Sequence, residues 1–259
     1  MEQLWPVQLF NKSVLKQRKF KEVTTLLGAT ESLHCLDIGS DNGVISYLLR
    51  QRGGSWKSAD LDDMSVTAIR ALVKDDVYQI DAHQVPFADN EFDVVAILDF
   101  LEHIHDDAAF VEELFRILKP GGSVIINVPH NKNSLLRRVR LALGQTDEKH
   151  GHVRHGYNPD SLRKLLGDRF QLESSKTYSK FFSELVDTMI VQAVYMTQKN
   201  KEDHSQKGAL VTDQDLKKNE KMFKMYSLIY PIVWFFAKLD NLLFLNSGYM
   251  MIAKANTKK

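Results

Sequence analysis

The feature of this sequence that most restricts its fold is the alternation of short apolar runs with amphipathic stretches across residues 33–129. The apolar runs have the length of buried strands, and the stretches between them carry apolar residues at helical spacing. Repeated strand and helix units of this kind wind around a mostly parallel sheet with helices on both faces. The sequence therefore predicts an α/β protein with a doubly wound sheet.

The expected elements can be placed along the chain. Strands are expected at residues 33–38, 55–59, 77–80, 92–98, 123–128, 171–178 and 248–254. Helices are expected at residues 44–52, 65–73, 107–118 and 159–166. The third of these helices ends where Pro120 cannot continue it, and where Gly121 and Gly122 supply the backbone freedom for a turn into the next strand.

Four segments are expected in chain order. Residues 1–30 form an N-terminal helical segment, residues 31–180 the ligand-binding core, residues 181–246 an apolar helical insertion, and residues 247–259 the closing strand of the core with a short tail. The N-terminal lysines alternate with apolar residues and no signal-peptide core is present, so we expect an amphipathic helix packed on the core. A polar, mobile connector is expected at residues 197–215.

Charge and cysteine content exclude several classes of protein. The net charge of +1 gives no basic surplus, and no nucleic-acid partner is therefore expected. The single cysteine, Cys35, rules out an intrachain disulfide and a cysteine-rich zinc site within one chain. A reducing, cytoplasmic location fits this composition best.

A glycine-containing loop follows the first expected strand. Asp37 stands at the end of that strand, and Gly39 and Gly43 lie between it and the next helix. This arrangement places backbone N–H groups and a helix N-terminus at the carboxyl edge of the sheet, where open α/β folds bind ligands. The glycines allow close approach of the backbone to a ligand, and Asp37 either accepts a hydrogen bond from an ammonium group or orders the loop.

Two further acids stand at the ends of the next strands. Asp60 comes 21 residues after Gly39, the spacing at which a carboxylate reaches the two hydroxyls of a ribose. Asp81 follows the third strand, so its carboxylate can accept from an adenine amino group. A nicotinamide dinucleotide is a weaker alternative, because Asp41 stands where the second glycine of a dinucleotide fingerprint meets the phosphates and would repel them. A cofactor without phosphate is favoured.

Five motifs occur in order between residues 36 and 129: LDIGSDNG, SADLD, DAHQVPFADNEFDVV, LEHIHDD and ELFRILKPGGSVIINVP. Together they resemble the class I S-adenosylmethionine-dependent methyltransferase family, in the group that includes the ubiquinone-biosynthesis type. The resemblance covers the cofactor-binding core alone, well under half of the chain. It implies a Rossmann-like, seven-stranded and mostly parallel sheet whose last strand, at residues 248–254, runs antiparallel to the rest.

The resemblance also implies the cofactor and its site. The cofactor would be S-adenosyl-L-methionine, with a site made of Asp37, Gly39, Ser40, Gly43, Asp60, Leu61, Asp81, Ala82 and Leu98. The loop residues in this set would line the methionine part, Asp60 the ribose, and Asp81 with Ala82 the adenine. Asp41 departs from the family, which usually has a second glycine at that position.

The family chemistry needs little covalent help from the protein, because the sulfonium already carries an activated methyl group. A base matters only when the acceptor holds a proton. His130, at the end of the fifth strand, and His155, in the following loop, are the predicted bases. His152 and Tyr157 are predicted to contact the acceptor.

Metal binding is the alternative role for the histidines. His150, His152 and His155 form a cluster in the sequence, but no cysteine lies nearby, and we predict no metal site. His103 and His105 follow the fourth strand and are given no chemical role.

The most individual part of the chain is the apolar segment at residues 222–245. Its uncharged run, at residues 225–237, contains Pro231 and is too short to cross a hydrocarbon layer of about 30 Å. Two alternatives stay open: the segment folds with residues 181–196 into a cap on the core, or it lies on a membrane interface. In either case Tyr230 and Trp234 are predicted to line a pocket for an apolar acceptor.

The sequence as a whole predicts methyl transfer to an oxygen atom of a small-molecule or lipid-like acceptor. The protein is expected in the cytoplasm, with peripheral membrane contact through residues 222–245 as the open alternative. A non-catalytic relative that binds the cofactor is the first competing function. A nicotinamide-dependent oxidoreductase is the second.

Overall fold

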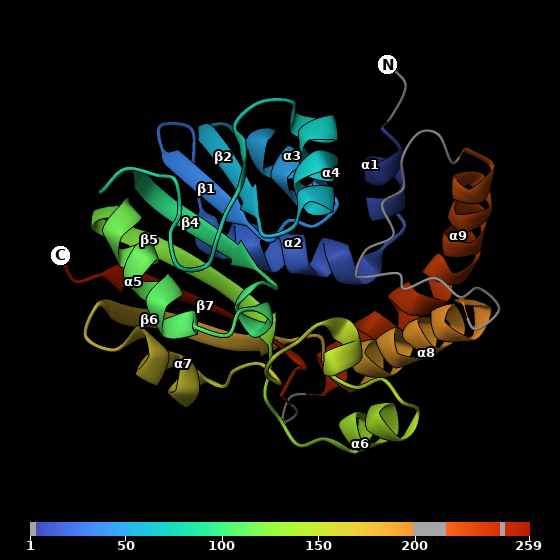
Figure 1. The fold of residues 1–259 in the computed structure, drawn as a ribbon. Coiled ribbons are helices and arrows are strands. Elements are labelled where there is room, and N and C mark those ends of the chain that lie inside the picture. Colours follow the sequence, from blue (N-terminus) through green and yellow to red (C-terminus); the bar gives the residue numbers. More distant parts are fainter. Residues whose placement is uncertain (1–3, 199–215, 244–246) are drawn as a thin grey trace.

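The computed structural model describes residues 4–198, 216–243 and 247–259. Apart from its first two positions, which end a helix, the connector expected at residues 197–215 lies outside these ranges. Figure 1 shows a central twisted sheet with helices on both faces and a group of helices at one end. This is the α/β, doubly wound architecture that the sequence predicts.

The sheet contains seven strands, which confirms the expected number. They are β1 (His34–Ile38), β2 (Ser55–Asp60), β3 (Val77–Gln79), β4 (Phe92–Leu98), β5 (Leu118–Pro129), β6 (Phe170–Tyr178) and β7 (Met250–Thr257). Their spatial order is β3-β2-β1-β4-β5-β7-β6. Strands β1 to β5 pair in parallel, and β7 is antiparallel to both β5 and β6. The antiparallel last strand is therefore confirmed.

The helices cover both faces of the sheet. They are α1 (Trp5–Phe10), α2 (Val14–Leu27), α3 (Val44–Arg50), α4 (Asp63–Val73), α5 (Asp107–Ile117), α6 (Leu135–Ala142), α7 (Pro159–Leu166), α8 (Phe181–Gln198) and α9 (Leu216–Leu239), with short 3-10 turns η1 (Leu101–His103), η2 (Glu148–His150) and η4 (Asp240–Leu242). Helices α5 and α7 pack their apolar faces against one side of the sheet. Helices α2 and α3 pack against the other side.

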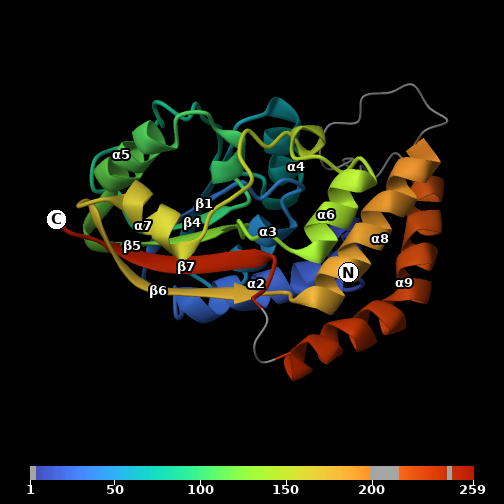
Figure 2. The same cartoon turned by 90° about the horizontal axis from the view of Figure 1, so that it is seen from below.

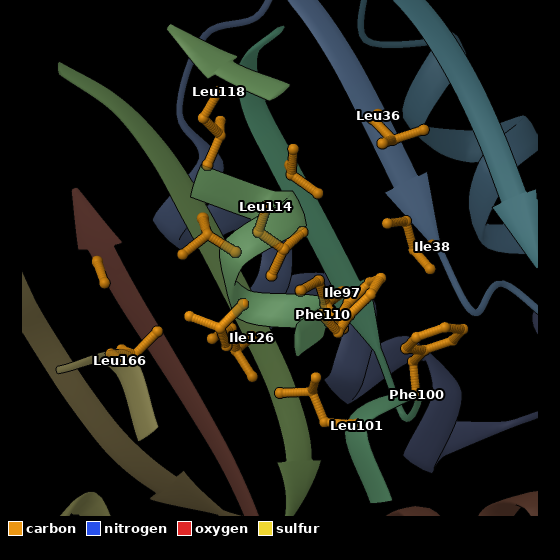
Figure 3. Packing of buried hydrophobic residues seen from close by; sticks show 14 of the residues in the cluster. Leu36, Ile38, Ile97, Phe100, Leu101, Phe110, Leu114, Leu118, Ile126 and Leu166 are labelled. Carbon is orange, nitrogen blue, oxygen red and sulfur yellow. The ribbon is translucent and has the colours of Figure 1, made fainter. Parts of the chain in front are cut away.

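The larger apolar cluster shows why the central strands are continuous apolar runs. Leu36 on β1, Ile97 on β4 and Ile126 on β5 point toward Phe110 and Leu114 of α5 (Figure 3), and all five side chains are essentially inaccessible to water. A strand covered by helices on both faces can place apolar side chains at every position. The result is a rigid platform whose carboxyl edge carries the loops described below.

Two local differences from the sequence prediction have simple causes. Helix α6 was not expected; Ser134 caps it by accepting from the backbone N–H of Arg137. Strand β5 starts at Leu118 rather than 123, because Leu118 already pairs with Phe92 while Ser123 pairs with Val94. The Lys-Pro-Gly-Gly stretch between them is therefore an irregularity within the strand rather than a turn before it.

Helices α6, α8 and α9 form the group at one end of the molecule. In Figure 2, α8 lies between α6 and α9, and both neighbours contact it. Helix α9 also contacts α1 and α2, so the N-terminal helices join this group. Within the part of the chain that the structure describes, no helix combines the length and the hydropathy needed to cross a bilayer.

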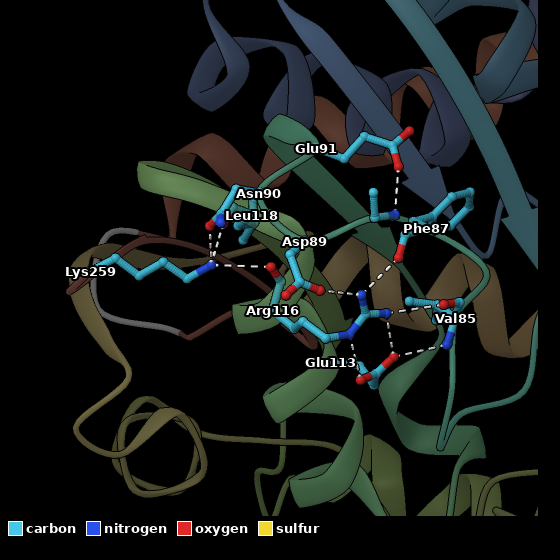
Figure 4. Close-up of polar contacts among 10 residues, drawn as sticks. Val85, Phe87, Asp89, Asn90, Glu91, Glu113, Arg116, Leu118 and Lys259 are labelled. Atoms are coloured by element: carbon cyan, nitrogen blue, oxygen red, sulfur yellow. Dashed lines mark hydrogen bonds and ion pairs between the residues drawn. The ribbon is translucent and has the colours of Figure 1, made fainter.

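A polar cluster at the start of β5 ties several loops to α5 (Figure 4). Arg116 donates from Nη1 to the Phe87 carbonyl at 2.7 Å and to Asp89 at 2.8 Å, and from Nη2 to Glu113 at 2.8 Å. Lys259 donates to the Asn90 side chain at 2.7 Å and to the Arg116 carbonyl at 3.1 Å. One guanidinium thus fixes the loop between β3 and β4 against α5.

Replacement of this guanidinium gives a first prediction. Arg116→Met is expected to lower the free energy of unfolding by about 1.5 to 3 kcal/mol, because it removes the donor of the Phe87 carbonyl and the cation that Glu113 and Asp89 share. Arg163→Met is the matched control: its ion pair with Asp160 lies on the surface, and its effect should stay within about 0.5 kcal/mol. Urea denaturation measures both. Equal stabilities of the two variants would contradict the structural role of Arg116.

Candidate functional site

The loops after β1 and β4 meet where the strand order reverses. Strands β1 and β4 are neighbours, and the chain leaves them toward opposite sides of the sheet. Open α/β sheets bind ligands in the crevice at this point. Gly39 and Gly43, both with positive φ, form the loop after β1.

Both glycines are required by close packing. A Cβ on Gly39 would lie 2.3 Å from the Leu98 carbonyl oxygen, and one on Gly43 would lie 2.7 Å from the Cα of Ile69. The first glycine therefore lets β1 and β4 converge, and the second lets α3 approach α4. Leu98 itself is buried, so its contribution at this edge is its backbone.

Asp37 and Ser40 lie inside the loop rather than on its surface. The Asp37 carboxylate accepts hydrogen bonds from the Ser46 and Ser58 hydroxyls and lies 3.6 Å from the Arg50 guanidinium. Burial raises the pKa of Asp37, and these three donors favour its charged form. Ser40 Oγ accepts from the Ser46 N–H at 3.0 Å. Of the two roles that the sequence allowed for Asp37, the structure fits the ordering of the loop.

Asp60 ends β2 beside this loop and is 7% exposed. Its carboxylate accepts from the backbone N–H groups of Leu61 at 2.8 Å and of Asp41 at 3.3 Å. Burial raises the pKa of Asp60 to about 6. Asp41 adopts a left-handed conformation with φ of 55°, which turns its N–H toward Asp60. The support that position 41 gives Asp60 comes from its backbone N–H, which a glycine would supply equally, so the departure from the family is tolerated here.

Three of the predicted cofactor residues line one open cavity at the same edge, which we call the Asp81 cavity. Its volume is about 660 Å³, and it is lined by Leu61, Gln79, Ile80, Asp81, Ala82, His83, His103, Ile104, His105 and Asp106. Asp81 accepts from the His83 N–H at 2.8 Å, which fixes its carboxylate at the rim. A flat base bearing an amino group fits this mixture of apolar and acceptor groups.

A lysine of α2 enters the site from the opposite side. Lys19 contacts the Asp99 carboxylate, which also accepts from the Asn127 side chain at 2.6 Å. Burial lowers the pKa of Lys16, and the charges of Asp41 and Asp99 act against that shift, so both lysines belong to one charge cluster. The sequence analysis assigned only packing to this helix. Lys16 and Lys19 stand three residues apart, which puts them on one face of α2, and this spacing was the available signal.

A second cavity, the histidine cavity, lies past the ends of β4 and β5. Its volume is about 300 Å³, and it is lined by Asp99, Glu102, Pro129, His130, Lys132, Arg137, Arg140, Leu141, Gln145, Asp147, His150, His152, His155, Glu184, Asp187, Val191, Tyr249 and Met250. Arg137 pairs with Asp147 at 3.0 Å, and Lys132 with Glu184 at 3.0 Å. The cavity is therefore polar and charged, whereas the sequence predicted an apolar acceptor pocket.

The hydrogen bond of one cavity histidine fixes its tautomer. His130 Nδ1 lies 2.9 Å from the Gly248 carbonyl, which can only accept, so Nδ1 carries the proton and Nε2 is the acceptor in the neutral ring. His155 Nδ1 contacts the Arg137 guanidinium and lies 3.5 Å from an Asp147 carboxylate oxygen. The His130 ring can therefore take a proton.

Burial also sets the charge of His152. It lowers the pKa of His152 to about 4, and the neighbouring His150 acts in the same direction. Burial likewise lowers the pKa of His155. His152 and His155 are therefore neutral at physiological pH.

Three of the predicted acceptor contacts lie outside the lining of the histidine cavity. The Tyr157 hydroxyl donates to Asp107 at 2.7 Å and is buried against the start of α5. Tyr230 lies under the Lys12 ammonium, 5.5 Å from ring centroid to Nζ, and Trp234 is 47% exposed on α9. Helix α8, which lies between α6 and α9 in Figure 2, contributes Glu184 and Asp187 to the lining, whereas α9 contributes no lining residue. Aromatic character alone could not reveal that arrangement.

A possible cation site lies at the wall of the histidine cavity. Glu102, His103 and His152 each place one ligand atom within 4.8 Å of the others. A carboxylate with two imidazoles suits a divalent transition metal. No metal was predicted from the sequence, in which only His150, His152 and His155 form a cluster. His103 is nearly fifty residues from His152 along the chain, and only the fold brings the two side chains together.

Comparisons with known proteins agree with this geometry. Residues 36–126 match the sequence model of a methyltransferase domain. A ubiquinone biosynthesis O-methyltransferase of Pseudomonas aeruginosa is 36% identical over 98 residues, which are 36% of this chain and 42% of that relative. A ubiquinone/menaquinone biosynthesis C-methyltransferase of Shewanella piezotolerans is 27% identical over 124 residues, 43% of this chain and 49% of that relative. The chain thus spans less than half the length of these curated relatives.

The fold comparison reaches further along the chain. A SAM dependent methyltransferase from Archaeoglobus fulgidus superimposes with a TM-score of 0.57 at 14% identity, covering 93% of this chain and 94% of that one. At such low identity the superposition shows the fold alone. Sequence match, strand order and the loop geometry at β1 agree: residues 36–126 match a methyltransferase domain and lie in the sheet that the solved methyltransferase shares.

Proposed function

We propose that this chain transfers the methyl group of S-adenosylmethionine to an oxygen atom of a small-molecule acceptor held in the histidine cavity. The observation that carries the proposal is His130, whose Nδ1 is committed to the Gly248 carbonyl and whose Nε2 is left as an acceptor in a polar cavity beside the cofactor edge. The Pseudomonas aeruginosa relative is named as an O-methyltransferase, which supports oxygen as the methylated atom.

Three groups of residues at the carboxyl edge of the sheet would bind the three parts of the cofactor. Asp60 accepts from the two ribose hydroxyls, and the Asp81 cavity takes the adenine. The amino-acid end of the cofactor carries one carboxylate and one ammonium, which match Lys19 and Asp99 in charge. Bound in this way, the sulfonium supplies an activated methyl group, and the protein contributes alignment.

The chain's own residues would act on the acceptor. His130 Nε2 takes the proton of the acceptor hydroxyl, and His155 lines the same cavity. Arg140 lies 4.0 Å from Asp187, farther than the other cation pairs of the cavity, and offers its guanidinium to an anionic substituent. A ring with adjacent polar groups fits these contacts better than the wholly apolar acceptor that the sequence suggested.

The direct test is formation of S-adenosylhomocysteine. Purified chain, S-adenosylmethionine and a panel of phenols, catechols and hydroxybenzoates are incubated, and both products are followed by mass spectrometry. Methylated oxygen supports the proposal. Cofactor binding without turnover on any member favours the non-catalytic relative, and calorimetric binding of NADH in preference to S-adenosylmethionine favours the oxidoreductase.

The role of Lys19 gives a second prediction. Lys19→Gln is expected to weaken S-adenosylmethionine binding about tenfold to thirtyfold, because it removes the cation for the cofactor carboxylate. Binding of 5′-methylthioadenosine, which lacks the amino-acid end, should change less than about twofold. Isothermal titration measures both, with the exposed Lys21→Gln as control. Equal losses for the two ligands would place Lys19 outside the amino-acid subsite.

A further inference from the structure

Helix α9 carries an apolar stripe on its outer side. Met225, Leu228, Ile232 and Phe235 follow one another at intervals of three and four residues, which aligns them along one side of a helix. Their side chains are between 48% and 78% exposed among the residues that the structure describes. Large apolar groups arranged in this way mark an interaction surface rather than scattered surface residues.

The stripe is additional to the face by which α9 already packs. Phe223 meets Trp5 of α1 with ring centroids 5.5 Å apart, Phe236 meets Phe182 of α8 at 6.1 Å, and Val233 is buried. Helix α9 is therefore held on the molecule by its inner side (Figures 1 and 2). The outer stripe is not needed for that contact.

Charges around the stripe complement an anionic surface. Residues 223–239 contain two exposed lysines, Lys224 and Lys238, and no acid. Asp240, the first acid beyond them, is buried and accepts backbone N–H groups at the start of α8. Each lysine near a negatively charged bilayer adds attraction, and acids would have opposed it.

Trp234 on this helix has neighbours of the kind that occur at membrane interfaces. Trp234 is half exposed beside Phe235, and Lys238 Nζ lies 5.2 Å from its ring centroid. An indole next to a lysine whose stem can extend toward lipid headgroups is the arrangement that such interfaces favour. A protein partner would call for a groove or pocket, whereas α9, which bends within its length and contains Pro231 between Leu228 and Ile232, lines neither of the two cavities described.

We propose that α9 docks on an anionic lipid surface, lying along it with Met225, Leu228, Ile232 and Phe235 inserted among the acyl chains. The helix does not meet the length and hydropathy needed to span a bilayer, which leaves an orientation in the interface plane. Helix α8 connects this surface to the histidine cavity, because it packs on α9 and carries the cavity residues Glu184 and Asp187. Docking then presents the cavity to an amphiphilic acceptor. That last consequence rests on the proposed function; the docking itself does not.

The test is co-sedimentation of the full chain with vesicles of phosphatidylcholine alone or with added phosphatidylglycerol. We expect binding to the anionic vesicles, and a decrease of about tenfold or more in the partition coefficient for the double variant Leu228→Gln/Ile232→Gln. Met64→Gln is the matched control, since Met64 is a 57% exposed methionine on α4 and should change nothing. Lys238→Gln should weaken binding to anionic vesicles only.

Several results would overturn the docking. They are wild-type chain that stays in the supernatant, equal binding to neutral and anionic vesicles, a double variant that binds like wild type, and an equal loss in Met64→Gln. A double variant that instead changes the mass of the free protein by light scattering would assign the stripe to a second copy of this chain. Titration of S-adenosylmethionine and turnover of a water-soluble acceptor, run on the same samples, report separately on the proposed function.

Discussion

An Asp60→Asn variant is expected to bind S-adenosylmethionine about a hundredfold more weakly than the wild-type chain. The two Asp60 oxygens are held by the N–H groups of Leu61 and Asp41, which leaves lone pairs free for both ribose hydroxyls. An amide keeps one acceptor oxygen and no charge. Hydrogen bonds to a charged group contribute about 1.5 to 3 kcal/mol each, so the loss of one and the weakening of the other account for the expected change.

The comparison needs a control with the same change of charge nearby. Asp63→Asn is suitable, because Asp63 is exposed at the start of α4 and faces solvent. Isothermal titration of both variants, with thermal unfolding to confirm the fold, separates a lost ligand contact from a damaged loop. Unchanged affinity in Asp60→Asn would remove the ribose assignment and with it the central part of the cofactor site.

The same carboxyl should make cofactor binding depend on pH. Burial raises the pKa of Asp60 to about 6, so below that pH the free protein carries a neutral acid that offers fewer acceptors. Ribose hydroxyls donate to the ionised form, and binding therefore favours deprotonation. Affinity should be constant above pH 7 and fall by about tenfold for each unit below 6. In Asp60→Asn this slope should vanish.

Removal of the His130 imidazole should stop turnover while leaving cofactor binding intact. His130→Ala is expected to lower kcat by about 10² to 10⁴ on an acceptor hydroxyl that must lose its proton, the range over which a positioned general base acts. The affinity for S-adenosylmethionine should change less than about twofold, because no cofactor group is assigned to this ring. Product formation by mass spectrometry gives kcat, and titration gives the affinity.

A purely structural role of His130 can be told apart from a chemical one. The ring also donates to the Gly248 carbonyl, so its loss could disturb the start of β7. Added imidazole should restore part of the turnover of His130→Ala only if the ring acts as a base. His34→Ala, at the exposed start of β1 on the other edge of the sheet, is the control. Normal turnover in His130→Ala would rule out this base.

The parts of the fold that could be predicted are those that depend on residues close together in the sequence. The apolar runs gave the strands, and the loop of Gly39 and Gly43 marked the switch point, because close approach of β1 to β4 and of α3 to α4 excludes any side chain there. Asp81 was predicted at this edge for the same reason, because it follows the third strand, whereas Ala82 was predicted from the family resemblance; both line the Asp81 cavity. Strand ends of a parallel sheet gather at one edge whatever the rest of the chain does.

The histidine cavity could not be predicted in that way. Its walls come from α6, α8 and the loop at residues 145–155, and which side of each helix faces inward depends on packing between distant segments. Arg137 and Asp147 neutralise each other only in the folded chain. Trp234 was assigned to the acceptor on its aromatic character, yet it is 47% exposed on α9 and does not line the cavity. Side-chain direction on a helix that packs at both sides is a tertiary property.

The contacts that orient His130 come from residues near the end of the chain. Its ring is oriented by the Gly248 carbonyl, and its backbone N–H donates to the Tyr249 carbonyl at 2.8 Å. Gly248 itself packs closely against Tyr178, because a Cβ at position 248 would lie 1.9 Å from the Tyr178 carbonyl oxygen. During synthesis, the residues around Gly39 and Asp60 leave the ribosome long before residues 248 and 249. The orientation and tautomer of the His130 ring would therefore be set only when the last strand pairs with β5.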